Sequence, residues 1–190
     1  LRFDRMNIQA WRHFYRGRLF EICKRSNAAI EAYRLALQFE PGLARAATAL
    51  GYLYAGQKQY TEAERWLTEG TRLLPGKASA WFNLGFVREA LGQPEPAITA
   101  FAEAVRLDRL LDRAWYGMGM CHAVLGRHEA AAQALEEAAT LQPMNPYAWY
   151  QLGMAHHVLH NADKVKEVIE HMFRFDPKMT RKLIQDTNRS

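Results

Sequence analysis

The sequence repeats with a period of 34 residues. Trp81, Trp115 and Trp149 are 34 residues apart and stand in nearly the same phrase, AWFNLGF, AWYGMGM and AWYQLGM. A fixed period of this length is typical of stacked supersecondary units. One unit cannot bury its apolar face alone, whereas stacked units can, and together they form an extended surface rather than an enclosed pocket. The period therefore favours binding over catalysis.

The period covers most of the chain. A 34-residue frame that begins at Ala10 restarts at Ala44, Ala78, Asp112 and Pro146 without an insertion. Its eighth position is always glycine, and small residues dominate its twentieth and twenty-seventh positions. Its thirty-second position is proline in four copies and Arg109 in the third copy. Small residues at fixed positions predict that helices approach each other closely, with large neighbours filling the space beside each glycine.

This pattern resembles the tetratricopeptide repeat (TPR) family, in which Trp-x-x-Leu-Gly-x-x-Tyr is followed by Ala, an aromatic residue, Ala and Pro at set offsets. The resemblance covers residues 10–179 and implies an all-α superhelical solenoid of helix-turn-helix repeats with a C-terminal capping helix. The expected parts are an N-terminal extension at 1–9, five repeats at 10–43, 44–77, 78–111, 112–145 and 146–179, and a capping helix and tail at 180–190.

Apolar residues recur at helical spacing within each repeat, and strand-like alternation is absent. Gly92 and Gly126 interrupt the pattern between the two helices of a repeat, and proline at position 32 ends the second helix. Without that proline at Arg109, the second helix of the third repeat is expected to run on, or its junction to bend differently. The predicted helices cover 10–24, 26–39, 44–56, 59–73, 78–91, 95–108, 112–125, 128–141, 146–160, 163–175 and 178–188.

A second apolar stripe on the first helix of each repeat is the candidate binding site. The resemblance implies that positions 2, 5, 9 and 12 face a concave groove, and spacings of three and four place them on one side of a helix. Other positions already supply the core, so this stripe requires a partner. Its aromatic, methionine and arginine residues are typical of binding hot spots. The candidate groove residues are Trp11, Phe14, Arg18, Arg45, Tyr52, Phe82, Phe86, Arg113, Tyr116, Met120, Tyr147, Tyr150, Met154 and His157.

The predicted function is a scaffold or adaptor that binds a peptide or helix of another protein in this groove. Arginines on an apolar floor favour a partner with acidic residues between apolar ones. Two alternatives stay open: a self-assembling structural solenoid, which would be a homo-oligomer, and a regulatory TPR segment of a larger enzyme.

Two family-specific binding patterns fail on this sequence. The resemblance implies a clamp for a C-terminal carboxylate built from Lys, Asn and Arg at set groove positions, and the corresponding residues here do not match. The asparagine ladder of the glycosyltransferase-linked repeats would occupy position 6, where only Asn83 is an asparagine. Neither a chaperone tail nor that enzyme class is therefore the expected partner.

The sequence predicts neither catalytic activity nor a bound cofactor. His156 and His160 are one helical turn apart, but no nearby cysteine or spaced carboxylate completes a metal site. His156 and His122 occupy position 11 of their repeats and are expected to be buried, hydrogen-bonded residues. Phosphate-binding loops and catalytic triads are absent from the sequence, so the chain is not predicted to be an enzyme.

Charge and cysteine content limit the compartment and the partners. The formal net charge of +5 comes from the ends, since residues 1–25 hold seven Lys and Arg residues while the middle is slightly acidic. The repeats lack a basic ladder, so nucleic acid is not expected to bind. No apolar run approaches 18 residues, so a transmembrane segment is not expected. Cys23 and Cys121 are predicted to be unpaired, which favours the cytoplasm, and an upstream targeting segment stays open.

Overall fold

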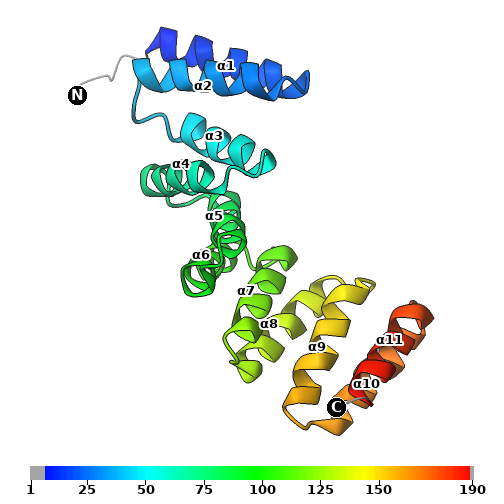
Figure 1. Cartoon of the computed structure of the whole chain (residues 1–190). Coiled ribbons are helices and arrows are strands. Elements are labelled where there is room, and N and C mark those ends of the chain that lie inside the picture. The colour runs from blue at the N-terminus through cyan, green and yellow to red at the C-terminus, as the bar shows by residue number, and fades with distance from the viewer. Residues whose placement is uncertain (1–6, 189–190) are drawn as a thin grey trace. The chain divides into compact units, whose positions relative to one another are not determined.

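A computed structural model describes residues 7–188 of the chain (Figure 1). Every regular element in this range is an α-helix, so the all-α prediction is confirmed. The described helices are α1 (Ile8–Ile22), α2 (Ser26–Phe39), α3 (Ala44–Gly56), α4 (Tyr60–Leu73), α5 (Ala78–Ala90), α6 (Pro94–Leu107), α7 (Asp112–Val124), α8 (His128–Leu141), α9 (Pro146–Val158), α10 (Ala162–Phe173) and α11 (Pro177–Thr187).

The helix bounds agree with the predicted ranges to within two residues. Two differences affect the expected parts. Helix α1 begins at Ile8, so the last two residues of the expected extension are helical, and α11 begins at Pro177, before the expected start of the capping helix at residue 180. Residues 1–6 of the extension and 189–190 of the tail lie outside the described residues.

The chain divides into two compact units, Leu1–Leu91 and Gly92–Ser190. The first unit contains α1 to α5, and the second contains α6 to α11. The third predicted repeat is therefore shared between the units.

In the first unit, each helix packs on the next one along the chain, from α1 to α5 (Figure 1). Tyr33 of α2 is fully buried at the centre of the α1–α3 core. Its ring lies against Gly17, where an added Cβ atom would be only 2.6 Å from Cε1 of Tyr33. The close approach of α1 and α2 therefore requires glycine at this position, as the repeat pattern predicted.

In the second unit, consecutive helices also pack together, and α11 packs on both α9 and α10 (Figure 1). Leu135 of α8 fills the space beside Gly119, where a Cβ atom would be 2.7 Å from Cγ of Leu135. Leu183 of α11 is fully buried and joins Met172 in the core of this unit. Helix α11 therefore covers the apolar end of the fifth repeat, as expected of a capping helix.

Side chains at the helix starts explain several boundaries. Asp176 accepts a hydrogen bond from the Met179 amide at 2.9 Å, and Asn145 accepts one from the Tyr147 amide at 3.1 Å. Such caps satisfy amides that have no partner inside the helix. Pro146 and Pro177 follow these caps, where a residue without an amide proton costs nothing.

The periodic tryptophans fix the junctions between repeats. The indole Nε1 of Trp81 donates to the Pro75 carbonyl at 2.8 Å, and that of Trp149 donates to the Pro143 carbonyl at 2.9 Å. Trp115 makes the same bond to the carbonyl of Arg109 at 3.0 Å. Because the acceptor is a backbone carbonyl, arginine can replace proline here, and α6 ends at Leu107 without running on.

Candidate peptide-binding groove

The predicted groove residues lie on the first helices of the repeats, α1, α3, α5, α7 and α9. The two units divide this surface into two parts. We call the part formed by α1, α3 and the start of α5 the first groove segment. The part formed by α7, α9 and α11 is the second groove segment.

The first groove segment contains a hollow of about 510 Å³. Phe14, Arg18, Arg45 and Tyr52, which were predicted to face the groove, all line it. Its other lining residues are Tyr15, Glu21, Thr48, Ala49, Lys77, Ser79 and Asn83. Of these, Tyr15, Ala49 and Asn83 occupy position 6, next to the predicted stripe on the helix surface, so a wider stripe would have found them.

Aromatic side chains form the base of this hollow. Phe14 is only 7% exposed, so it belongs to the core as well as to the groove. Trp11 packs edge-on against Phe14 with ring centroids 5.5 Å apart, and the Arg45 guanidinium lies 5.9 Å above the Trp11 ring. Trp11 therefore supports the groove from beside it. Phe82 and Phe86 of α5 do not line this hollow.

The first groove segment carries excess positive charge. Arg18, Arg45 and Lys77 line it against the single carboxylate of Glu21. Glu21 is already engaged, because Arg18 pairs with it at 3.2 Å and the Tyr33 hydroxyl donates a hydrogen bond to it. Burial, followed by this bond to Glu21, raises the pKa of Tyr33. Arg45 has no ion pair with any residue in the range 7–188.

The second groove segment contains two hollows that share Tyr147. Arg113 and Tyr116 line the smaller one, about 210 Å³, together with Asp112, Ala138, Asn145 and Tyr147. The larger one, about 680 Å³, is lined by Tyr147, Asp176, Lys178, Met179, Arg181, Lys182 and Gln185. Most of this lining comes from α11, which the four-position stripe did not include. In the sequence, the basic residues of the C-terminal tail indicated that this part of the lining is positively charged.

Tyr150 is held by the capping helix. Its hydroxyl donates to Asp186 at 2.7 Å, and the Lys182 ammonium lies 4.9 Å from the centre of its ring. Burial and the hydrogen bond to Asp186 raise the pKa of Tyr150 to about 12. In this arrangement Tyr150 anchors α11 to α9, and a ligand must compete with that contact to reach its hydroxyl.

The remaining predicted residues are more dispersed. Met154 is half-buried and packs against the core of the second unit, and Met120 is half-buried and lines none of the hollows described above. His157 lines a separate hollow of about 410 Å³ between α9, α10 and α11, together with Ile184 and Asn188. Of the fourteen predicted residues, four line the hollow of the first groove segment and four line hollows of the second unit. The other six line none of the hollows described above: Trp11, Phe82, Phe86, Met120, Tyr150 and Met154.

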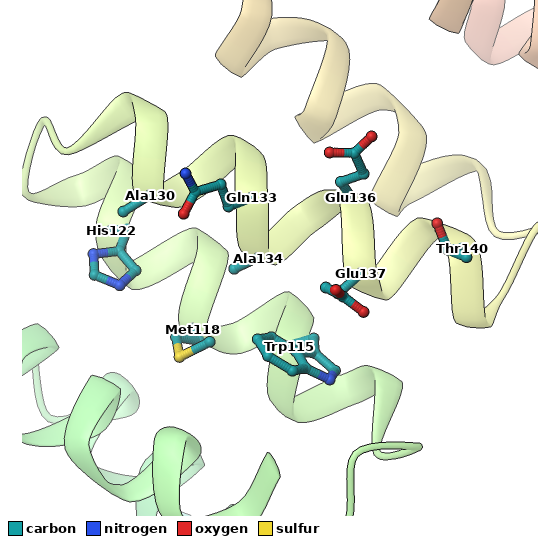
Figure 2. Close-up of a pocket in the computed structure, with 9 residues that line it drawn as sticks. All are labelled: Trp115, Met118, His122, Ala130, Gln133, Ala134, Glu136, Glu137 and Thr140. Carbon is teal, nitrogen blue, oxygen red and sulfur yellow. The ribbon is translucent and has the colours of Figure 1, made fainter. Parts of the chain in front are cut away.

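Another hollow of about 640 Å³ lies between α7 and α8, and its lining residues are drawn in Figure 2. Trp115, Met118 and His122 contribute from α7, and Gln133, Glu136, Glu137 and Thr140 are among those from α8. These α7 residues occupy positions 4, 7 and 11, which lie on the side of the helix opposite to the groove stripe. Sequence reasoning assigned these positions to the core and did not predict this hollow.

The expectation for His122 and His156 is only partly met. Both rings are half-buried, but the buried Nδ1 atom of each lacks a hydrogen-bond partner among the described residues. Burial lowers the pKa of both rings, and Arg127 lowers that of His122 further. Between residues 7 and 188, no three His, Cys, Asp or Glu side chains cluster in a way that could hold a metal ion.

Cys23 is exposed, and Cys121 is buried, as expected of a small core residue. None of the described helices combines the length and the apolar character needed to cross a membrane.

Comparison with known proteins identifies the family. The sequence profile of the tetratricopeptide repeat family matches residues 48–109, 82–146 and 125–164. Because these matches cover more than half of the chain, the protein belongs to the TPR family. Proteins of this family generally mediate protein–protein interactions. Comparison with curated protein sequences gave no match.

Solved structures confirm the fold class. YrrB, a TPR protein with an unusual peptide-binding site, has a TM-score of 0.83 at 22% identity, covering 91% of this chain and 90% of its own. MamA has a TM-score of 0.83 at 21% identity, covering 93% of this chain and 96% of its own. PilF of Pseudomonas aeruginosa has a TM-score of 0.76 at 22% identity, covering 94% of this chain and 82% of its own.

Proposed function

We propose that the protein is an interaction module that binds a peptide segment of a partner protein in the first groove segment. The observation that carries this proposal is a hollow of about 510 Å³ whose exposed lining combines Tyr52 with three cationic side chains. Such a surface fits a segment in which acidic residues alternate with apolar ones. The protein would act through this contact as a scaffold or adaptor rather than as an enzyme.

The side chains of the hollow suit this ligand. Tyr52 is 58% exposed although it is large and aromatic, so it offers contact area that no part of the first unit covers. Tyrosine and arginine are frequent at the centres of interfaces because they contribute area and hydrogen bonds at modest entropic cost. Asn83 adds an amide that can donate to and accept from a peptide backbone.

Charge selects among apolar segments. With Glu21 already bonded to Arg18 and Tyr33, the Arg45 guanidinium and the exposed Lys77 ammonium are the charges directed to a ligand. Acidic side chains placed between apolar anchors would meet them and would fix the register of the bound segment. The fold that this chain shares with YrrB supports a peptide as the ligand class.

A peptide-display selection on the full chain tests the proposal. Selected peptides should be enriched in Asp and Glu next to apolar residues. Tyr52→Ala should weaken their binding about tenfold or more, since truncating a central aromatic residue typically costs about 2 kcal/mol. Phe173→Ala is the matched control, because Phe173 is 64% exposed on α10 and lines none of the hollows described above.

The control variant should bind as the wild type does. Equal losses in the two variants would show that the selected peptides do not use the groove. Enrichment of basic peptides instead of acidic ones would refute the charge argument while leaving the groove itself in place.

A further inference from the structure

The hollow between α7 and α8 lies on the opposite side of α7 from the groove stripe. We call it the α7–α8 hollow, and its volume is about 640 Å³. Figure 2 shows Trp115, Met118 and His122 of α7 facing Ala134 and Glu137 of α8. Helix α6 packs on α7 and α9 packs on α8, so the hollow belongs to a repeat that has neighbours on both sides within the second unit.

The repeat register shows that this hollow lacks a cation that two earlier repeats have. Glu69 and Glu103 at position 26 each pair with an arginine three residues later, at 2.7 Å and 2.8 Å. The fourth repeat keeps the glutamate as Glu137 but has Thr140 at position 29. The side chain of Glu137 is 48% exposed, against 37% for the other two glutamates, and its ion pair with Arg109 is long, at 4.0 Å.

A second carboxylate lines the same hollow. Glu136 has no ion pair with a described residue, and its charge acts at longer range on His156 and Lys164 of the next repeat. None of the described Lys and Arg side chains lines the hollow. The α7–α8 hollow therefore presents two negative charges and no positive one, which is the reverse of the first groove segment.

The ring of Trp115 provides a second kind of contact for a cation. In the fifth repeat, His171 at position 26 stacks on the equivalent Trp149, with ring centroids 4.1 Å apart. The fourth repeat has Glu137 in place of this histidine, and within residues 7–188 Trp115 has neither an aromatic ring nor a cation against its ring. A planar guanidinium group can stack on an indole and pair with a carboxylate at the same time.

We propose that the α7–α8 hollow binds an arginine side chain in a basic segment of a partner protein, with the guanidinium group paired to Glu137 and stacked on Trp115. This arginine takes the place that Arg72 and Arg106 have in the second and third repeats. Met118 is half-buried, whereas the leucines at position 7 of three other repeats are buried. Its flexible side chain can therefore pack on the apolar part of the segment.

Charge argues against other ligands for this hollow. The carboxylates of Glu136 and Glu137 would repel phosphate groups of nucleic acids and of anionic lipids. They would also repel the acidic segment proposed for the first groove segment. The two surfaces thus select partner segments of opposite charge, so the second surface extends the proposed scaffold function without depending on it.

The test uses a fluorescein-labelled heptapeptide, Gly-Ala-Arg-Leu-Arg-Ala-Gly-amide, titrated with the full chain. A matched peptide has citrulline, whose urea group is neutral and similar in shape, at both arginine positions. The arginine peptide should bind at least about tenfold more tightly, because its guanidinium groups meet the two carboxylates. The protein has a formal net charge of +5, so this preference cannot come from its overall charge.

The variant Thr140→Arg supplies the missing arginine within the chain. This side chain should pair with Glu137 and occupy the site, which reduces the affinity for the arginine peptide at least about fivefold. Thr68→Arg is the charge-matched control, because Thr68 is exposed on α4 and lines none of the hollows described above. The control should bind as the wild type does.

Removal of the two carboxylates is the complementary change. Glu136→Gln with Glu137→Gln should also reduce affinity at least about fivefold, since both counter-charges are lost. Glu31→Gln with Glu62→Gln changes the net charge by the same amount outside the hollows described above, and it should leave affinity unchanged. Circular dichroism on every variant checks that the helices are intact.

Four results would overturn the proposal. The first is an absence of binding at millimolar peptide, or equal binding of the citrulline peptide. The second is an equal loss in Thr140→Arg and Thr68→Arg, which would make the overall charge responsible. The third is a loss in Tyr52→Ala but not in Thr140→Arg, which would place the peptide in the first groove segment. The fourth is self-association that Thr140→Arg abolishes, which would make a second copy the occupant.

Discussion

The turn inside each repeat contains one residue with a left-handed backbone. At position 15 of the five repeats, φ is 56° at Lys24, 60° at Lys58, 72° at Gly92, 70° at Gly126 and 55° at His160. Glycine adopts this conformation freely, whereas a residue with a Cβ atom is strained there. The repeat therefore imposes one backbone geometry at this position, and only two copies have the residue that suits it best.

Replacing Lys58 with glycine should stabilise the protein. Relief of backbone strain outweighs the added freedom of the unfolded chain by about 0.5–1 kcal/mol. The reverse substitution, Gly126→Ala, should destabilise by about 1–2 kcal/mol, because nothing lies within 4 Å of the added Cβ atom and only the backbone strain remains. Urea unfolding measures both. A destabilised Lys58→Gly would show that contacts of the lysine side chain outweigh the strain.

The half-buried histidines should make stability depend on pH. Burial lowers the pKa of His122 and His156 below the ordinary value of 6.5. Near pH 6 the unfolded chain therefore binds more protons at these sites than the folded chain does. Stability from the neutral rings is present above pH 6.5 and is lost as the pH falls through the lowered pKa values.

The double variant His122→Gln and His156→Gln should lose less stability than the wild type between pH 7 and pH 5. The variant lacks both imidazole rings, whose protonation is unfavourable in the folded state. Urea unfolding at half-unit pH steps measures the slope, and each protein is compared with its own value at pH 7. Equal slopes in the two proteins would assign the pH dependence to other groups.

At the scale of helices, the sequence predicted the helix bounds, because these follow from the spacing of residues that are close together along the chain. Apolar spacing together with glycine and proline boundaries placed every described helix to within two residues. Of the two outcomes expected at Arg109, the run-on of the second helix did not occur, since α6 ends at Leu107 and Trp115 bonds to the Arg109 carbonyl. Any residue at position 109 has a backbone carbonyl that can accept this bond. The residue pattern therefore could not show that the junction is kept without proline. The twist at this junction stays a prediction.

Helix α11 should contribute strongly to stability through one side chain. Leu183 is fully buried against Gly153, whereas its neighbour Ile184 is 36% exposed. Leu183→Ala should cost about 2–5 kcal/mol, because it leaves a cavity between α11 and α9. Ile184→Ala, which removes a similar side chain from the same helix, should cost less than about 1 kcal/mol.

Thermal and urea unfolding compare these two variants with deletion of residues 177–190. The deletion should lower the melting temperature at least as much as Leu183→Ala does, because it uncovers the fully buried Met172. An unchanged melting temperature after deletion would show that α11 is dispensable for the fifth repeat.

At the scale of the molecule, helical periodicity indicated which side of each first helix is available but not what covers it. Arg18, Arg45 and Tyr52 were predicted and do line one hollow. Tyr150 was predicted on the same stripe, yet it bonds to Asp186 of α11. The side of a helix follows from local spacing, whereas the bond to α11 joins residues 36 positions apart and depends on tertiary packing.

The charge of the first groove segment gives the final prediction. Arg45 and Lys77 line the hollow with no ion pair to a described residue, so a bound acidic segment would supply their counter-charges. Affinity for the selected acidic peptides should fall as salt rises, because added ions screen partly exposed charges over about 10 Å at 0.1 M. Arg45→Glu with Lys77→Glu should weaken binding about tenfold or more and flatten the salt dependence.

A charge-matched control separates this local effect from the net charge. Arg34→Glu with Arg65→Glu changes two exposed arginines that pair with Glu31 and Glu62 outside the hollow. Both double variants replace two positive charges with two negative ones, so both lower the formal net charge from +5 to +1. Only the groove variant should lose affinity if the ligand lies against Arg45 and Lys77. Equal losses would mean that the overall charge attracts the peptide. If the affinity changes neither with salt nor on charge reversal, Tyr52 and the aromatic base form the whole recognition surface.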